Sequence, residues 1–205
     1  PGRAGRGSVG IPRVLNMYED YPFWFTFFTK LGFRVILSSA DIREIPVSAL
    51  ETIPSYSECY PVKLVHAHIL DLIRRKPDFI WYPCIDHGPD EGNENSYMCP
   101  MVTSYPETIA GNMDALLHRA GIPFLHPFLP LHNKDALIPR LTEELQKMHI
   151  PYGDIMHAAE AAREEMEKYK EDLAAETKRV LREIKERGLT GIVLAGRPYH
   201  VDPAA

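Results

Sequence analysis

The sequence predicts an α/β fold, specifically a Rossmann-like doubly wound and mainly parallel sheet with helices on both faces. Two observations support this prediction. Short runs rich in β-branched and aromatic residues alternate with longer runs of helical apolar spacing, and glycine or proline marks most of the boundaries between them. Such alternation is typical of βαβ units, because parallel strands need a crossover helix between them.

The strands are expected where short apolar runs end at a turn residue. The expected strands are 13–17, 33–38, 78–82, 101–104 and 123–126. The helices between them have start and stop signals. Pro22 lies in the first turn of the first helix and Gly32 ends it, Pro61 opens the second, and Gly121 ends the third. The expected helices are 21–31, 61–76, 105–121, 134–149 and 152–187.

The last of these helices is the longest, and it is rich in Ala, Glu, Lys and Arg, which all favour helix. One apolar seam along it indicates a scaffold helix that packs on one side. We expect four segments: a Gly/Arg-rich linker at 1–10, a cysteine-bearing Rossmann-like domain at 11–150, a connecting helix at 151–188, and a strand that opens a second, truncated α/β domain at 189–205. The chain therefore reads as a piece of a longer polypeptide.

Composition narrows the class of protein. The chain has 205 residues, of which 45% are hydrophobic and 25% charged, so it can bury a core. Its net charge of -5 gives no reason to expect nucleic acid as a partner. No apolar run reaches the about 18 to 20 residues that span a bilayer, and no signal peptide is present, so we expect a cytoplasmic protein without a membrane partner. Glycine-rich phosphate loops are also absent, which argues against ATP hydrolysis by this segment.

Three cysteines are the most informative candidates. Cys59, Cys84 and Cys99 each lie close to a proline at the end of an expected element, and their odd number argues against a simple disulfide framework. Soft thiolates bind zinc, copper(I) or iron–sulfur clusters. Considered alone, the residues leave open ordinary half-buried thiols, structural zinc and a cluster. Because a cubane normally takes four protein ligands, three cysteines would leave one iron open.

Other candidates surround the cysteines, and each has a simpler alternative. Candidates for acid–base chemistry are Glu58, His87 and Glu107, and candidates for cofactor binding are Lys63, His66 and Arg197. A helix-start carboxylate, an exposed loop histidine, a solvated lysine or a strand-ending turn would explain them equally well. His66 is expected to face solvent or the site, and His68 to lie in the core. The aromatic block at 18–28 is expected to be core or interface, in preference to a ligand pocket.

Several motifs in order resemble the acyl-CoA dehydratase activase-related proteins, which carry a CoA enzyme activase uncharacterised domain. They are GIPRVLNMYE at 10–19, ECYPVKLVH at 58–66, YPC at 82–84, CP at 99–100, TSYPE at 103–107 and GRPYH at 196–200. The resemblance covers nearly the whole chain from residue 10. These proteins are in turn similar to the subunits of 2-hydroxyacyl-CoA dehydratases and benzoyl-CoA reductases.

The resemblance implies a Rossmann-like domain that holds a 4Fe-4S cluster, single or double-cubane, through Cys59, Cys84 and Cys99. It also implies that ATP binds only to modules outside this chain, that those ATPase activator modules deliver a low-potential electron, and that an acyl-CoA is the substrate. The isolated segment is then expected to be inactive, and a homodimer is compatible with the family. A module of another class, which binds an acyl-CoA or similar anion without metal and without catalysis, is the alternative.

Overall fold

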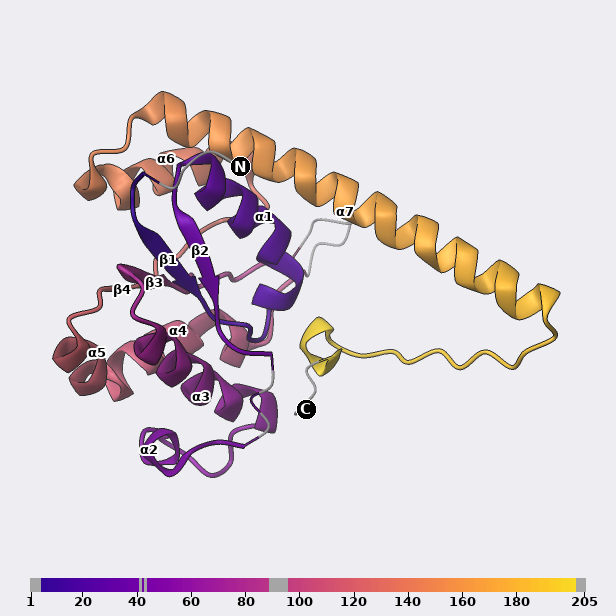
Figure 1. The fold of residues 1–205 in the computed structure, drawn as a ribbon, viewed down its shortest axis with the longest axis horizontal. Helices are drawn as coiled ribbons and strands as arrows, with labels where there is room; N and C mark the ends of the chain where they lie inside the picture. Colours follow the sequence, from indigo (N-terminus) through magenta and orange to yellow (C-terminus); the bar gives the residue numbers. More distant parts are fainter. Residues whose placement is uncertain (1–4, 41, 43, 89–95, 202–205) are drawn as a thin grey trace.

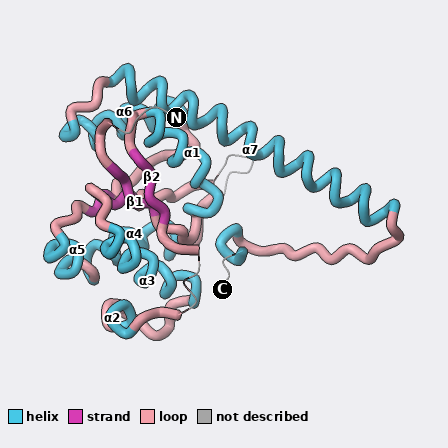
Figure 2. Tube along the Cα trace, in the orientation of Figure 1, coloured by secondary structure: helices cyan, strands magenta, loops and turns pink. Residues whose placement is uncertain are grey.

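A computed structural model describes residues 5–40, 42, 44–88 and 96–201. Its centre is a four-stranded, all-parallel sheet with the order β2-β1-β3-β4 (Figure 1, Figure 2). The strands are β1 (Ser8–Ile11), β2 (Arg34–Leu37), β3 (Phe79–Trp81) and β4 (Phe124–Leu125). In register, Val9 pairs with Val35 on one side and with Phe79 on the other. The predicted fold class is therefore confirmed.

Helices cover both faces of the sheet (Figure 1). One layer holds α1, α6 and α7, in which α7 contacts both α1 and α6, and the other holds α2 to α5, linked by contacts between successive helices. The helices are α1 (Met17–Lys30), α2 (Val47–Leu50), α3 (Tyr60–Arg75), α4 (Pro100–Asn112), α5 (Asp114–Ala120), α6 (Lys134–Leu145) and α7 (Tyr152–Glu186), with 3-10 turns η1 (Gln146–Met148) and η2 (Pro198–Val201).

Aromatic rings fill the core between α1 and the sheet. The rings of Trp24 and Phe28 lie with their centroids 5.2 and 5.3 Å from that of Trp81 in β3, at tilted or edge-on angles. All three side chains are buried. Such offset contacts are the favourable ones for aromatic rings. The aromatic block is therefore core, as expected, although Phe25 points outward.

The strand order identifies where a ligand would collect. The chain passes from β1 to β2 on one side and later to β3 on the other side of β1, so the topology reverses between β1 and β3. In open α/β sheets, ligands bind beyond the carboxyl ends of the strands at such a point. A ligand site is therefore expected among the residues that follow β1 and β3.

Two of the strands predicted between residues 11 and 150 are wrong. The first strand is Ser8–Ile11, residues 13–16 form the turn that follows, and Met17 begins α1. Residues 8–10 thus belong to the sheet and not to a linker. Apolar Val14 and Leu15 suggested a strand, but they are buried because the turn itself packs into the core. Likewise 101–104 is helical, because Pro100 opens α4 one step after Cys99.

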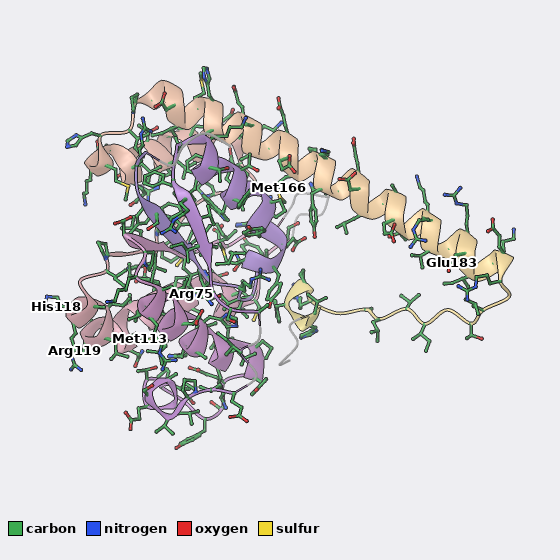
Figure 3. The ribbon with its side chains drawn as sticks, viewed as in Figure 1. Arg75, Met113, His118, Arg119, Met166 and Glu183 are labelled. Atoms are coloured by element: carbon green, nitrogen blue, oxygen red, sulfur yellow. The ribbon has the colours of Figure 1, made fainter. Side chains whose placement is uncertain are left out.

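The long helix has two unlike halves. Its near half packs on α1, with Ile155, Ala159 and Ala162 buried, whereas the half that bears Glu183 projects beyond the sheet (Figure 3). The strand expected after it is not formed, and Ile192, Val193 and Leu194 are 86%, 90% and 93% exposed. A single strand without a neighbour cannot pair its backbone, which explains the difference. None of the described helices is long and apolar enough to cross a membrane.

Candidate functional site

Cys84 is the most firmly held of the three cysteines. It lies just beyond β3, where its N–H donates to Pro127 O over 2.9 Å and its C=O accepts from the Leu129 N–H over 3.0 Å. These bonds continue the pairing of β3 with β4 as an isolated parallel bridge to Phe128. The side chain is fully buried. Cys84 therefore lies at the point where the topology of the sheet reverses, as expected.

Cys59 and Cys99 occupy equivalent positions on two neighbouring helices. Cys59 is the N-cap of α3 and Cys99 the N-cap of α4, and each is followed by proline in the first helical turn. Helices that follow parallel strands begin at the carboxyl edge of the sheet, so both cysteines belong to that edge. Cys59 is exposed, Cys99 is half-buried, and all three thiols are free. The N-terminal N–H groups of a helix favour a negatively charged ligand.

Tyr199 connects the two helix-start cysteines. Burial raises the pKa of Tyr199, the nearby thiols of Cys99 and Cys59 act in the same direction, and Arg197 acts against them. The Tyr199 side chain also lines a small cavity together with Pro61 in the first turn of α3. The C-terminal turn η2 therefore reaches the carboxyl edge, although more than a hundred residues separate Tyr199 from α3 in the chain.

Two further tyrosines extend the link to Cys84. Burial raises the pKa of Tyr105, as do its bond to Glu58 and the proximity of Tyr82 and Cys59. Burial also raises the pKa of Tyr82, with a smaller effect of Cys84 in the same direction. Each cysteine thus has a tyrosine hydroxyl within electrostatic range, and Cys59 and Cys84 are linked through Tyr105 and Tyr82.

A chain of short hydrogen bonds fixes Tyr105. Its hydroxyl donates to Glu58 Oε2 over 2.6 Å and lies 2.8 Å from His66 Nε2. His66 Nδ1 lies 2.7 Å from the Thr52 hydroxyl, which donates to Ala49 O over 2.8 Å. Burial lowers the pKa of His66 to about 4, so its imidazole is neutral at pH 7 and donates from one nitrogen only. These hydrogen bonds tie the loop before Cys59 to both α3 and α4.

These contacts decide between the two alternatives that the sequence left for His66. The side chain is fully buried and faces Tyr105, so it lies toward the site and not toward solvent. His68 lies in the interior as expected, with Nδ1 2.8 Å from the Ser38 hydroxyl.

Glu107 is the predicted acid–base candidate that lies nearest to Cys84. Burial raises the pKa of the Cys84 thiol to about 12, the charge of Glu107 adds to this effect, and a hydrogen bond from the Glu107 backbone N–H opposes it. The Glu107 carboxylate itself lies 2.9 Å from His126 Nδ1. Cys84 is therefore a neutral thiol in the protein as described, and a bound metal would have to displace its proton.

The remaining predicted residues have local partners. His87 Nδ1 lies 3.0 Å from Asp86 Oδ1 on an exposed loop just after Cys84. The Lys63 ammonium donates to Tyr56 O over 2.7 Å and so holds the loop before Cys59. Arg197 is exposed, and its backbone N–H donates to His200 Nδ1 over 3.3 Å.

The positions of the possible metal-ligating side chains favour some kinds of metal site over others. Among the described residues, no three His, Cys, Asp or Glu side chains are grouped so that they could hold a metal ion. A preformed zinc site of the three cysteines is therefore not supported. A cubane makes a different demand, because each cysteine binds a different iron. A separate observation is compatible with a bound group at this edge: the Tyr82 hydroxyl is buried near Cys84 and has no hydrogen-bond partner among the described residues.

The fold and the edge define a class of protein: a parallel α/β domain whose three free cysteines follow a strand or begin a helix at the carboxyl edge. Within this class, the chain belongs to the family described as CoA enzyme activase uncharacterised domain (DUF2229), whose model matches residues 8–205. Comparisons with curated proteins and with solved structures gave no match.

The three tyrosines were not among the residues predicted for the site. The sequence does contain a signal for them, because Tyr82, Tyr105 and Tyr199 each adjoin a proline within one of the motifs that suggested the family. This signal does not single them out, because Tyr21, Tyr60 and Tyr152 also adjoin a proline.

Proposed function

We propose that this domain holds a 4Fe-4S-type cluster through Cys59, Cys84 and Cys99, and that it serves an ATP-driven 2-hydroxyacyl-CoA dehydratase or reductase system. The observation that supports the proposal most strongly is the position of three free thiols at one edge of the sheet: Cys84 is fixed just beyond β3, and Cys59 and Cys99 begin the neighbouring helices α3 and α4. Family membership supports the wider system. When bound, such a cluster supplies a low-potential electron and an iron that is open to a substrate oxygen.

The residues of the chain have distinct tasks in this proposal. The backbone bonds of Cys84 to 127–129 keep it at a fixed point, and the starts of α3 and α4 favour anionic thiolates at Cys59 and Cys99. The Tyr82 hydroxyl is a buried donor without an acceptor, and it is suited to donate to a thiolate. Electrons would come from ATPase modules outside this chain, with an acyl-CoA as the substrate class.

Anaerobic reconstitution of the chain with ferrous iron and sulfide tests the proposal. We expect a broad absorption at the blue end of the spectrum, with iron and acid-labile sulfide bound in equal amounts. Cys84→Ala should weaken it most, because Cys84 is the best-fixed ligand. Cys59→Ala and Cys99→Ala should weaken it as well.

Matched controls separate ligand loss from misfolding. Cys84→Ser keeps the size of the side chain, so a folded protein without colour would identify a lost ligand. A wild-type protein that stays colourless, or alanine variants as coloured as wild type, would refute the proposal. Loss of a residue that hydrogen-bonds to a metal ligand typically costs about 10- to 100-fold in affinity, so loss of a ligand itself should cost at least as much.

A second function, binding of an acyl-CoA or similar anion without metal, is favoured by one observation. Arg13 follows β1 at the topological switch point, and its Nε is buried without a hydrogen-bond partner. A guanidinium N–H placed there is suited to an anionic group. The test is titration of metal-free protein with a CoA thioester. Binding that Arg13→Gln abolishes and that a triple Cys→Ala variant retains would favour this function over the cluster.

A further inference from the structure

The C-terminal turn η2 is built by local contacts that present Tyr199. The Arg197 N–H donates to His200 Nδ1, and the Tyr199 and His200 rings meet edge-on with centroids 5.0 Å apart. Gly196 leaves room for this contact, because a Cβ at this position would lie 2.8 Å from His200 Nδ1 and the imidazole would have to shift. The turn therefore has a defined shape of its own, with Tyr199 on its inner side.

Tyr199 reaches the switch point of the sheet. It lines a small cavity whose other walls come from the turn after β1 and from the first two turns of α3. The lining residues are Arg13, Val14, Leu15, Tyr18, Pro61, Leu64 and Tyr199. The ring packs against the hydrophobic core, and η2 contacts α1 (Figure 1). Tyr199 is thus inserted where α3 begins, next to Cys59.

The segment between α7 and η2 does not hold η2 against the domain. Residues 189–197 run back from the far end of α7 without secondary structure, and all of them are exposed (Figure 2). An exposed connection contributes few contacts that could hold η2 in place. The position of η2 must therefore come from its own contacts with the domain, among which Tyr199 packs most closely on the core.

We infer that Tyr199 is a further residue of the cysteine site, and that η2 is a cover which holds this side chain over Cys59 and Cys99. The inference relies on the proposed function only for where the site lies. It adds a residue from the far end of the chain to a site otherwise built from β3, α3 and α4. The ring lies beside both helix-start cysteines and shields Cys99 from solvent, whereas Cys59 stays exposed and Cys84 is buried by the sheet itself.

Thiol alkylation of metal-free protein tests the inference without a cluster. Iodoacetamide labelling of each cysteine is followed by peptide mass spectrometry. In Tyr199→Ala, we expect Cys99 to react faster by roughly three- to tenfold, because a local cover opens at a small free-energy cost. Cys59 should change less, because it is already exposed. Tyr199→Phe should behave as wild type, because the ring provides the cover.

Two internal controls accompany this measurement. Tyr152→Ala removes a 57% exposed tyrosine at the start of α7 and should leave all three rates unchanged. Cys84 reports on folding, because it becomes reactive only if the core opens. Unchanged rates at Cys59 and Cys99 in a folded Tyr199→Ala protein would overturn the inference, whatever the outcome of iron reconstitution.

Disulfide trapping provides a second measurement that does not depend on the alanine variant. In Tyr199→Cys, mild oxidation with diamide should join the new thiol to Cys59 or Cys99, because two thiols must lie within a short Cβ separation to form a disulfide. Tyr152→Cys should not form such a bond. If Tyr199→Cys forms no disulfide with either cysteine while all thiols remain titratable, η2 does not cover the site.

Discussion

The carboxyl edge of the sheet and the distal half of α7 are held together by different kinds of contact. At the edge, the bonds that fix Tyr105 join residues 39 and 47 positions apart in the chain. In the distal half of α7, the ion pairs join residues three or four apart, as in the bonds from Arg179 to Glu176 and Glu183. The edge therefore exists only in the folded domain, whereas the distal helix depends on local sequence.

This difference teaches where function can reside. A constellation built from long-range bonds positions its side chains precisely enough for chemistry, because packing restricts every partner. A helix held by exposed ion pairs is restrained only weakly, since such pairs contribute little and are screened by salt. The cysteines, tyrosines and His66 all lie in the first region. The connecting-helix interpretation fits the second.

The largest effect that tests this comparison comes from the same substitution made in the core of the domain and in distal α7. Leu72→Ala in α3 removes a fully buried side chain and should destabilise the protein by about 2 to 5 kcal/mol. Leu181→Ala in distal α7 removes a side chain that is 59% exposed and should change stability by less than about 0.5 kcal/mol. Urea unfolding followed by circular dichroism measures both. Equal effects would contradict the division into two regions.

The next effect concerns the seam between α1 and the near half of α7. Burial raises the pKa of Asp20 to about 7, partly offset by its hydrogen bond from Asn16. Because the folded state binds this proton more tightly than the unfolded state, the contribution of Asp20 to stability falls as pH rises from about 4 to about 7. Asp20→Asn should therefore gain stability relative to wild type over that range, by at most about 4 kcal/mol at pH 8.

The quantity to measure is the difference in the free energy of unfolding between Asp20→Asn and wild type, followed as a function of pH. His66 has the opposite slope, because its folded pKa of about 4 lies below the unfolded value of 6.5, and stability is lost as pH falls through that range. The two slopes partly cancel in wild type. Groups that wild type and Asp20→Asn share contribute equally to both free energies of unfolding and cancel in the difference. A difference that does not change with pH would show that Asp20 is hydrated and that the seam is open to water.

A smaller effect is expected from the hydroxyl at the centre of the edge. Tyr105→Phe leaves Glu58 Oε2 and His66 Nε2 without their partner, which should cost about 1 to 3 kcal/mol. Tyr56→Phe is the matched control, because Tyr56 is fully exposed and its hydroxyl is free to bind water. Chemical denaturation measures both. If Tyr105→Phe is as stable as wild type, the hydrogen-bond chain does not hold the edge together.

The same comparison explains what the sequence could predict. Local signals placed α7 within about one residue at each end, since helix propensity and an apolar seam act along the chain. The cysteines were correctly placed at element ends because proline marks those ends. Tyr105 and Tyr199 were missed because their partners lie far away in sequence, where neither periodicity nor propensity has information.

The wrong elements have the same physical cause. The buried turn at Val14 and Leu15 was taken for a strand, because apolar content reports burial and not backbone shape. The run at 192–194 has the composition of a central strand, but composition cannot provide the neighbouring strand that pairing requires. Both errors arise where tertiary context, and not local preference, decides the structure.

The smallest effect belongs to the distal helix and completes the comparison. Arg179→Gln removes the central cation of the Glu176–Arg179–Glu183 network and should leave the urea midpoint unchanged, because these side chains are exposed. The change should appear only locally. Hydrogen exchange in distal α7 should accelerate at low salt and match wild type at high salt, while the buried turns near Ile155 and Ala162 stay protected. Loss of protection in both halves would mean that α7 unfolds as one cooperative unit, and the distal half would then belong to the domain and not to a spacer.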